Sequence, residues 1–450
     1  MPKEKKIALS EEMIDDIPLV DIHVHLPGVI SPNTAWSLGV RHKFISVEQG
    51  EFDKGYRWRS GPASLCKDNP HDCYLDIFHP DISLDEKGHP KKLSYNIDHR
   101  SFKSFDHIMA TVQGHRNPPG GIQTEEDLRF VLMEYLNDCI EQKIVYVELQ
   151  QNIRIAYQIY SSDEPEIARK KLYDLFYDII CEFEKSSITL RFLHCFNKTQ
   201  SACLSISAHD RAMEAGLWLE EAAIYRPGVF VGLESAGHEK DESGWPEHLK
   251  DGYDYVHKLG LGCEAHGGEG IGVEHMIDVI RTLPVTRLAH GFQAIEDEKA
   301  VEEVIRRGIT LVMMPAINIA LGAVVHGYRD ENGDIVPLAK SRGGKKQYIA
   351  NIADHPFFTL MRQYPDLKIM LSSDNPQIGG QPIKKMIKML AGLGEYGAMY
   401  RDSSVNNEPL TANELYTLAV NSINAAFCDD SVRSGYIIQL RQWGEKYGVL

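Results

Sequence analysis

The 450-residue sequence lacks several features that would assign a protein to a class at once. It has no apolar run long enough to cross a bilayer, and its start, MPKEKKIALSEEMIDDIP, lacks the apolar centre of a signal peptide. The eight cysteines are scattered, and none lies in a CxxC pair. A disulfide framework is therefore disfavoured, and the sequence predicts a reduced, cytoplasmic protein without a membrane partner.

Positive charge is also scarce. The chain has 48 Lys and Arg against 64 Asp and Glu, a formal net charge of -16. This balance argues against a binder of nucleic-acid polymers, because such proteins present basic surfaces. The acidic charge balance is still compatible with a site in which a local basic patch binds a small anion. Two basic groups could form one, or could be ordinary solvated surface: Arg342, Lys345 and Lys346, and Lys384, Lys385 and Lys388.

Internal repeats and low-complexity linkers are absent as well, and short apolar runs alternate instead with segments of helical periodicity. The candidate strands are residues 17–25, 143–150, 187–195, 228–234, 260–266, 285–290, 309–314 and 367–374. Near-continuous apolar runs are typical of strands buried on both faces. Eight of them alternating with helices predict an α/β fold, a (β/α)8 TIM-type barrel. A doubly wound open sheet is the alternative, although the first strand lacks the glycine-rich phosphate loop expected there.

The length allows one large domain with insertions or several smaller ones. We expect a single barrel domain over residues 1–450, with an insertion at about 40–120 and a long loop at about 325–350. Loops at the carboxyl ends of barrel strands shape the substrate pocket, so we expect both segments at the catalytic face. The insertion at 40–120 is also a candidate surface for a homo-oligomer or a partner. Before the second strand, Thr124 and Asp127 predict a capping box that begins a helix.

Polar residues occur where several predicted strands end. The first strand ends in DIHVHLPG, and His23 and His25 would share one face of it because side chains alternate along a strand. His266 of CEAHGGEG, His290 of LAHGF and Asp374 of SSDNPQ end the fifth, sixth and eighth strands. In a barrel all five would meet at one rim. Histidine nitrogen and carboxylate oxygen are ligands of zinc, so the sequence predicts a metal site there.

These blocks together resemble a known family. VDIHVHLPGVIS, EAHGGEG, RLAHGF and LSSDNPQ are similar to the signature blocks of the adenosine deaminase family of metal-dependent hydrolases. MMPAINIALGAV and NSINAAF resemble two further blocks of that family. In order and spacing, the resemblance covers essentially residues 17–428. No single block is specific, but the set is.

The resemblance implies a role for each site residue. One Zn2+ would be held by four ligands: His23, His25, His266 and Asp374. Glu269 would donate a proton to N1 of a purine, and His290 would act as base toward the metal-bound water. Substrate contacts would come from Gly237, facing N3, from Asn375, facing N7, and from the turn that contains Gly268.

The chemistry requires these residue types. Displacing an amine from an aromatic carbon needs hydroxide near neutral pH, and zinc lowers the pKa of bound water from 15.7 to about 7. The ring gains negative charge as it is attacked, and a carboxylic acid with a pKa raised by burial can relieve it by protonation. Related two-metal hydrolases use a carboxylated lysine after the fourth strand. This chain has Glu234 and Ser235 there, so one metal is expected, with Glu234 as a bridge to a second metal the lesser alternative.

Two positions depart from the family pattern. Pro27 stands where adenosine-specific members carry an acid for the ribose 5′-hydroxyl, so it either favours a 5′-phosphate or only stiffens the turn before Gly28. Asn375 replaces a second aspartate, and its amide can donate to N7 without being protonated. A smaller departure is ELQQNIR in the second strand.

The predicted function is zinc-dependent hydrolytic deamination of the 6-amino group of an adenine nucleoside or nucleotide. The substrates would be adenosine, deoxyadenosine or their 5′-phosphates, and the products an inosine-type purine and ammonia. One alternative is another amidohydrolase-type hydrolase of amides or esters, which would not need an acid at Glu269. The other is a zinc-bearing nucleotide sensor or assembly subunit.

Overall fold

The computed structural model describes most of the chain. Side chains are described for residues 6–31, 34, 37–38, 41–42, 121–199, 206–319, 321, 323–324, 352–378, 381–397, 400 and 407–450. Short strands are described at 45–46, 51–52, 115–116, 119–120, 327–329, 335–337 and 347–349. The predicted insertion at about 40–120 lies mainly outside the described residues, and the first basic group, Arg342, Lys345 and Lys346, lies wholly outside them. In the described part of the chain, no helix is both long and apolar enough to cross a membrane.

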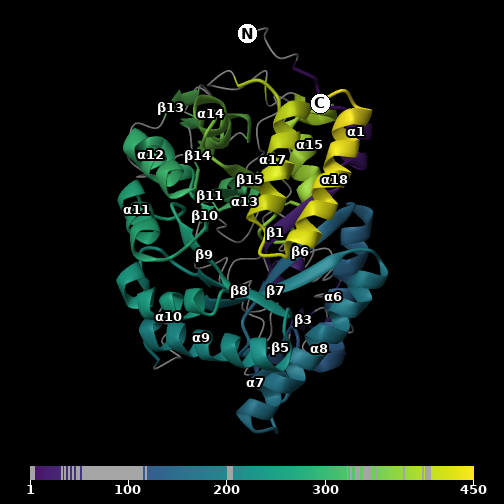
Figure 1. Cartoon of the computed structure of the whole chain (residues 1–450), viewed down its shortest axis with the longest axis vertical. Coiled ribbons are helices and arrows are strands. Elements are labelled where there is room, and N and C mark those ends of the chain that lie inside the picture. Colours follow the sequence, from purple (N-terminus) through teal and green to yellow (C-terminus); the bar gives the residue numbers. More distant parts are fainter. Residues whose placement is uncertain are drawn as a thin grey trace.

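Eight parallel strands form the centre of the molecule (Figure 1). They are β1 (Leu19–His25), β6 (Ile144–Gln151), β7 (Thr189–Asn197), β8 (Phe230–Ala236), β9 (Gly262–Gly267), β10 (Arg287–His290), β11 (Thr310–Met313) and β15 (Ile369–Leu371). Each falls at a predicted strand, and they pair in chain order. An isolated bridge between Val24 and Asp374 brings the eighth strand back to the first. The barrel prediction is confirmed, and the doubly wound alternative is wrong.

Helices follow the strands and surround them (Figure 1). The α-helices are α1 (Glu11–Asp16), α6 (Glu125–Glu141), α7 (Ile155–Ile159), α8 (Pro165–Lys185), α9 (Ala208–Tyr225), α10 (Pro246–Lys258), α11 (Val273–Thr282), α12 (Glu298–Arg307), α13 (Pro315–Ala320), α14 (Pro356–Gln363), α15 (Ile383–Leu390), α17 (Ala412–Ala425) and α18 (Asp430–Lys446). Short 3-10 turns are η1 (Leu26–Val29), η2 (Glu242–Gly244), η3 (Phe292–Glu296), η4 (Ile352–Asp354) and η5 (Gly394–Tyr396). Helix α6 begins with the predicted capping box of Thr124 and Asp127.

The core lies between the barrel and its helices, because most strand positions are buried and the helices present apolar faces to them. The strand β1 is buried at every position. The helix α6 buries Leu128, Val131, Leu132 and Cys139 against the sheet, which is the stripe that a period of 3.6 residues places on one side. The last helices, α17 and α18, pack against each other, and α17 also contacts β1 and β15. The carboxyl-terminal segment therefore covers the seam where the barrel closes.

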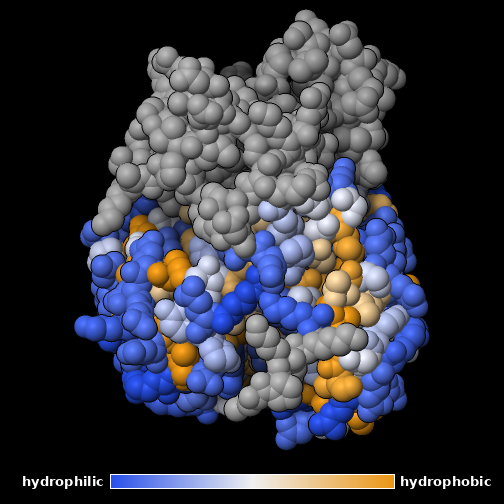
Figure 2. Space-filling model, turned by 90° about the horizontal axis from the view of Figure 1, so that it is seen from above, coloured by the Kyte–Doolittle hydropathy of each residue, from blue (hydrophilic) through white to orange (hydrophobic). Residues whose placement is uncertain are grey.

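The long loop predicted at about 325–350 contains strands. The backbone there forms a three-stranded antiparallel sheet of β12 (Gly327–Arg329), β13 (Ile335–Pro337) and β14 (Gln347–Ile349). Two further strand pairs are β2 (Ile45–Ser46) with β3 (Glu51–Phe52), and β4 (His115–Arg116) with β5 (Pro119–Gly120). The long connection predicted at about 325–350 therefore contains a small sheet of its own. On the described part of the face in Figure 2, hydrophobic residues occur in small groups among hydrophilic ones.

Candidate metal centre

Three histidines gather at the carboxyl ends of strands β1 and β9. The ring centroids of His23 and His25 are 5.1 Å apart, those of His23 and His266 5.0 Å, and those of His25 and His266 5.6 Å. Asp374 joins them because its backbone pairs with β1: its N–H donates to His23, and its carbonyl accepts from His25, both at 2.9 Å. Ligand atoms of His23, His25 and Asp374 lie within 4.8 Å of one another. The four predicted ligands are thus brought together.

The rings of His23 and His266 are each held from behind by a buried carboxylate. Nδ1 of His23 donates to Glu264 at 2.6 Å, and Nδ1 of His266 donates to Glu234 at 2.5 Å. These bonds leave each Nε2 free to face the cluster, and Nε2 of His23 is buried without a hydrogen-bond partner. A carboxylate behind a histidine is the usual outer support of a metal ligand. The donor set therefore fits a divalent cation.

The charges of the cluster also suit a cation. Burial lowers the pKa values of His23 and His25 well below the ordinary value, which keeps both rings neutral as ligands must be. Burial also raises the pKa of Asp374 to about 7. At His266, burial acts to lower the pKa, but the neighbouring Glu234 carboxylate outweighs it and raises the value to about 9. A cation would compensate the buried carboxylates at this site.

Cys195 of β7 supports the remaining histidine. Its Sγ lies 3.9 Å from Nδ1 of His25 and donates to Glu234 at 2.7 Å. Both oxygens of Glu234 are therefore engaged, one by Cys195 and one by His266. This disfavours Glu234 as a bridge to a second metal. Sequence reasoning missed Cys195, since its only signal was a cysteine at the end of an apolar strand.

Glu269 and His290 face each other beside the metal ligands. Nε2 of His290 lies 3.5 Å from Oε2 of Glu269, and it is buried without a hydrogen-bond partner. Burial raises the pKa of Glu269 to about 8 and lowers that of His290 well below its ordinary value. At neutral pH the pair is thus a protonated acid and a neutral imidazole.

Asn318 of α13 holds the other side of the His290 ring, with its amide nitrogen 2.9 Å from Nδ1. The amide oxygen is buried and unpaired in this orientation. Rotating the amide would make it an acceptor, which would place the histidine proton on Nδ1 and leave Nε2 as a base. Asn318 lies inside MMPAINIALGAV, but the sequence alone gave no reason to single it out.

The backbone at the site is conformationally unusual. His290 and Asp374 have φ angles of 65° and 62°, which residues with side chains rarely adopt. Such strain concentrates at functional sites, where the surrounding contacts maintain it. Gly237 and Gly268 lie in the turns after β8 and β9 with φ angles of 110° and 76°. A Cβ on Gly237 would come within 2.4 Å of Asn197 Oδ1, so both turns require glycine.

Asn375 is buried directly after the metal ligand Asp374. Its amide nitrogen donates to the Asp374 carboxylate, and its Oδ1 is buried without a partner. Pro27 lies buried in η1, the turn whose Gly28 carbonyl accepts from Gln377 at 2.8 Å. This buried position agrees with the interpretation that Pro27 stiffens the turn before Gly28. The contacts of Asn375, Gly237 and Gly268 with a purine stay predictions.

The described basic group lies away from the metal ligands. Nζ of Lys384 is 3.2 Å from the carbonyl of Glu141, which precedes β6 and so lies at the amino ends of the strands. Lys388 forms an ion pair with Glu11 at 3.2 Å, and both lysines lie 3.5 Å from Asp15. Of the two interpretations, a basic patch for a small anion or ordinary solvated surface, these lysines therefore fit the second, since their partners are acidic groups far from the metal cluster.

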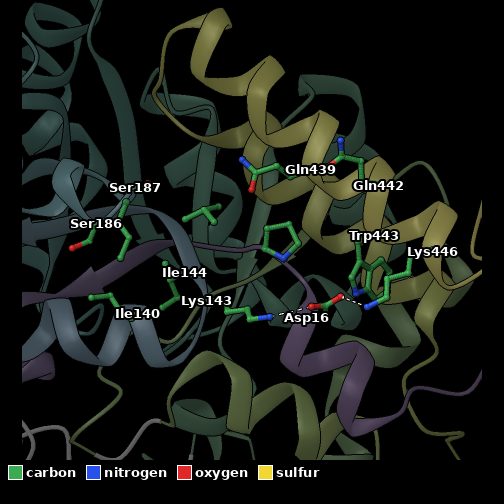
Figure 3. Close-up of a pocket in the computed structure, with 13 residues that line it drawn as sticks. Asp16, Ile140, Lys143, Ile144, Ser186, Ser187, Gln439, Gln442, Trp443 and Lys446 are labelled. Carbon is green, nitrogen blue, oxygen red and sulfur yellow. Dashed lines mark hydrogen bonds and ion pairs between the residues drawn. The ribbon is translucent and has the colours of Figure 1, made fainter.

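A surface pocket of about 500 Å3 also lies at that opposite end (Figure 3). Its walls include Pro18, Ile144 and Ile188 from the starts of β1, β6 and β7, and Trp443 of α18. Asp16 lies there between two lysines, Lys143 at 3.0 Å and Lys446 at 2.8 Å. The length of the strands separates this pocket from the metal cluster.

Comparisons with known proteins identify the family of this chain. The adenosine deaminase family model matches residues 84–330. Adenine deaminase of Cupriavidus metallidurans is 26% identical over 435 residues, covering 96% of this chain and 93% of the relative. Adenosine deaminase of Clostridium acetobutylicum is 21% identical over 434 residues, covering 96% of this chain and 99% of the relative.

Solved structures share the fold at lower identity. An amidohydrolase of Burkholderia ambifaria with bound Zn has a TM-score of 0.64 at 17% identity and covers 100% of both chains. The N6-methyl-AMP deaminase of Arabidopsis thaliana has a TM-score of 0.56 at 15% identity, covering 97% of this chain and 100% of that one. The family model and the geometry of the cluster lead to one assignment. This chain belongs to the adenosine deaminase family of metal-dependent hydrolases.

Proposed function

We propose that this protein is a zinc-dependent deaminase that hydrolyses the 6-amino group of an adenine-containing substrate. The observation that carries the proposal is the buried acid Glu269, 3.5 Å from His290 and beside the predicted metal ligands. Amide or ester hydrolysis needs a metal and a base but no acid for a ring nitrogen. A nucleotide sensor would need neither the acid nor the base.

Zinc would be held by His23, His25, His266 and Asp374. When bound, it supplies hydroxide near neutral pH by lowering the pKa of a coordinated water. Relatives support a divalent metal, and the amidohydrolase with bound Zn supports zinc among them. Histidine nitrogens with one carboxylate are also the donor set that zinc prefers.

The protein groups divide the proton transfers between them. Glu269 is protonated at neutral pH because burial raises its pKa to about 8, so it can donate to N1 as the ring is attacked. His290 can accept a proton from the attacking water through Nε2, provided that Asn318 accepts from Nδ1. Glu269 then carries the proton to be donated, and Nε2 of His290 is free to accept one, as the reaction requires.

The substrate choice is open between the free base, the nucleoside and the 5′-nucleotide. Curated relatives are an adenine deaminase and an adenosine deaminase, and a structural neighbour acts on N6-methyl-AMP. Pro27 removes a carboxylate that would repel a 5′-phosphate. The lysines of α15 no longer support a phosphate, because they lie at the other end of the barrel.

The proposal is tested by ammonia release from the zinc-loaded protein. The panel is adenine, adenosine, deoxyadenosine and N6-methyl-AMP, with the mono-, di- and triphosphates of both nucleosides. We expect turnover of at least one, and its loss in Glu269→Gln, which cannot donate a proton but keeps the shape of the acid. Preference for a phosphorylated form would support the interpretation of Pro27. If the zinc-bound protein releases ammonia from no compound of the panel, the deaminase assignment is rejected and a nucleotide sensor is favoured.

A further inference from the structure

The turn that carries Glu269 is held by a second buried carboxylate. Glu239 follows β8 and is 3% exposed. Its Oε2 accepts backbone N–H groups from three consecutive residues: Glu269 at 3.2 Å, Gly270 at 2.6 Å and Ile271 at 3.0 Å. Its Oε1 is also 3.2 Å from the N–H of Glu269. One side chain thus accepts hydrogen bonds from all three residues of the turn.

The turn has no regular partner for these N–H groups. Strand β9 ends at Gly267 and α11 begins at Val273, so residues 269–271 belong to neither element. Consecutive N–H groups that converge on one point form a concave anion-binding site, and a carboxylate is a strong acceptor for them. Without Glu239, these buried donors would lose their acceptor.

Glu239 is itself held in place. The carbonyl of Glu239 accepts from Trp245 Nε1 at 3.1 Å, and the turn before it is fixed by His238 N–H donating to Thr199 Oγ1 at 2.7 Å. Lys198 is also buried, with Nζ 3.4 Å from the carbonyl of His266. A buried carboxylate is costly unless it is hydrogen-bonded, and the three N–H groups of the turn meet that condition.

We infer that Glu239 is a positioning residue, which orients the Glu269 carboxyl toward His290 and the metal centre by fixing the backbone of residues 269–271. The inference rests on the proposed function, in which Glu269 is the proton donor. Metal binding should be largely independent of Glu239. His266 belongs to β9, pairs with Ala289 of β10 and is supported by Glu234, so Glu239 does not contact the metal ligand.

The test compares Glu239→Gln, Glu239→Asp and the control Glu302→Gln, which changes an acid on the exposed side of α12. With zinc loaded, we expect Glu239→Gln to lower kcat by about 10²-fold, the effect of a misplaced catalytic group, with a smaller change in KM. Zinc content should stay at the wild-type level. Glu239→Asp keeps the charge and should recover part of the rate. Unchanged kcat in Glu239→Gln would overturn the inference.

A double-mutant cycle separates positioning from general damage. In a Glu269→Gln background the acid is already lost, so adding Glu239→Gln should cost little more. Equal fold losses of kcat in the two backgrounds would contradict the inference.

Amide hydrogen exchange tests the contact without any substrate. We expect the amides of residues 269–271 to exchange roughly tenfold faster in Glu239→Gln, with those of β9 and β10 unchanged. Unchanged exchange at 269–271 would overturn the inference even if the enzyme were active. If no purine is turned over, the proposed function fails, while faster local exchange would still support Glu239 as the residue that fixes the turn.

Discussion

The carboxylate of Glu264 joins the predicted metal ligand His23 to a buried arginine. One oxygen accepts from His23 Nδ1 at 2.6 Å, and the other accepts from Arg287 at 2.6 Å. Arg287 also donates to Glu148 at 2.6 Å, and its guanidinium lies 3.8 Å from the Phe427 ring centroid. The orientation of a metal ligand thus depends on an ion network in the barrel interior.

Removing the cation of this network should destabilise the fold. We expect Arg287→Leu to lower the free energy of unfolding by about 3–5 kcal/mol, because Glu148 and Glu264 would remain buried without their partner. Urea unfolding measures the change. Arg306→Gln, which breaks an exposed pair with Glu303, is the matched control and should have little effect. Equal free energies of unfolding for Arg287→Leu and wild type would show that the ion network makes no net contribution to stability.

Replacing Glu264 should weaken metal binding more than folding. In Glu264→Gln the amide can still accept from His23 but carries no charge to raise the basicity of the imidazole. Changes to such outer partners typically cost 10–100-fold in metal affinity, roughly the effect we expect here. Competition with a chelator measures it. Unaltered zinc affinity would contradict the supporting role assigned to Glu264.

The rate should fall at alkaline pH. The competent form has Glu269 protonated, and burial raises its pKa to about 8 in the metal-free site. A neighbouring cation favours the carboxylate, so kcat/KM should decrease as pH rises through a value at or below about 8. A pH profile of kcat/KM for the best substrate of the panel checks the sign. A rate that keeps increasing into alkaline pH would be inconsistent with Glu269 as the acid.

Removing the metal should lower both activity and stability. A metal that binds only the folded protein stabilises it by about 2.7 kcal/mol at a hundred times its Kd. Dialysis against chelator should therefore lower the thermal midpoint, and added zinc should restore it. His25→Ala lacks one predicted ligand and should respond less to zinc. Full response in that variant would argue against His25 as a ligand.

The order of elements and most of the site could be predicted from the sequence. Apolar runs set the strand positions, and in a parallel barrel all strand carboxyl ends meet at one rim. Residues at those ends, such as His25 and His266, therefore converge whatever the loops do. The resemblance of the blocks supplied their roles.

The placement of α15 was not predictable in the same way. Lys384 follows the eighth strand in sequence, but it lies at the opposite end of the barrel, where its Nζ meets the carbonyl of Glu141. Segments without periodicity have no direction that a sequence pattern reveals. The short strands inside the long loop at 325–350 were not predicted for a related reason, since strands of three residues are too short to show alternation.

The sequence by itself determined which residues end each strand, because hydrophobic periodicity is local and the barrel repeats one geometry eight times. Only the tertiary structure decided what supports those residues. Glu239 acts on a turn 30 to 32 positions away. Glu264 and Asn318 likewise reach His23 and His290 across 241 and 28 positions. Such contacts depend on side-chain direction and burial between neighbouring strands and loops, which spacing along the chain does not encode.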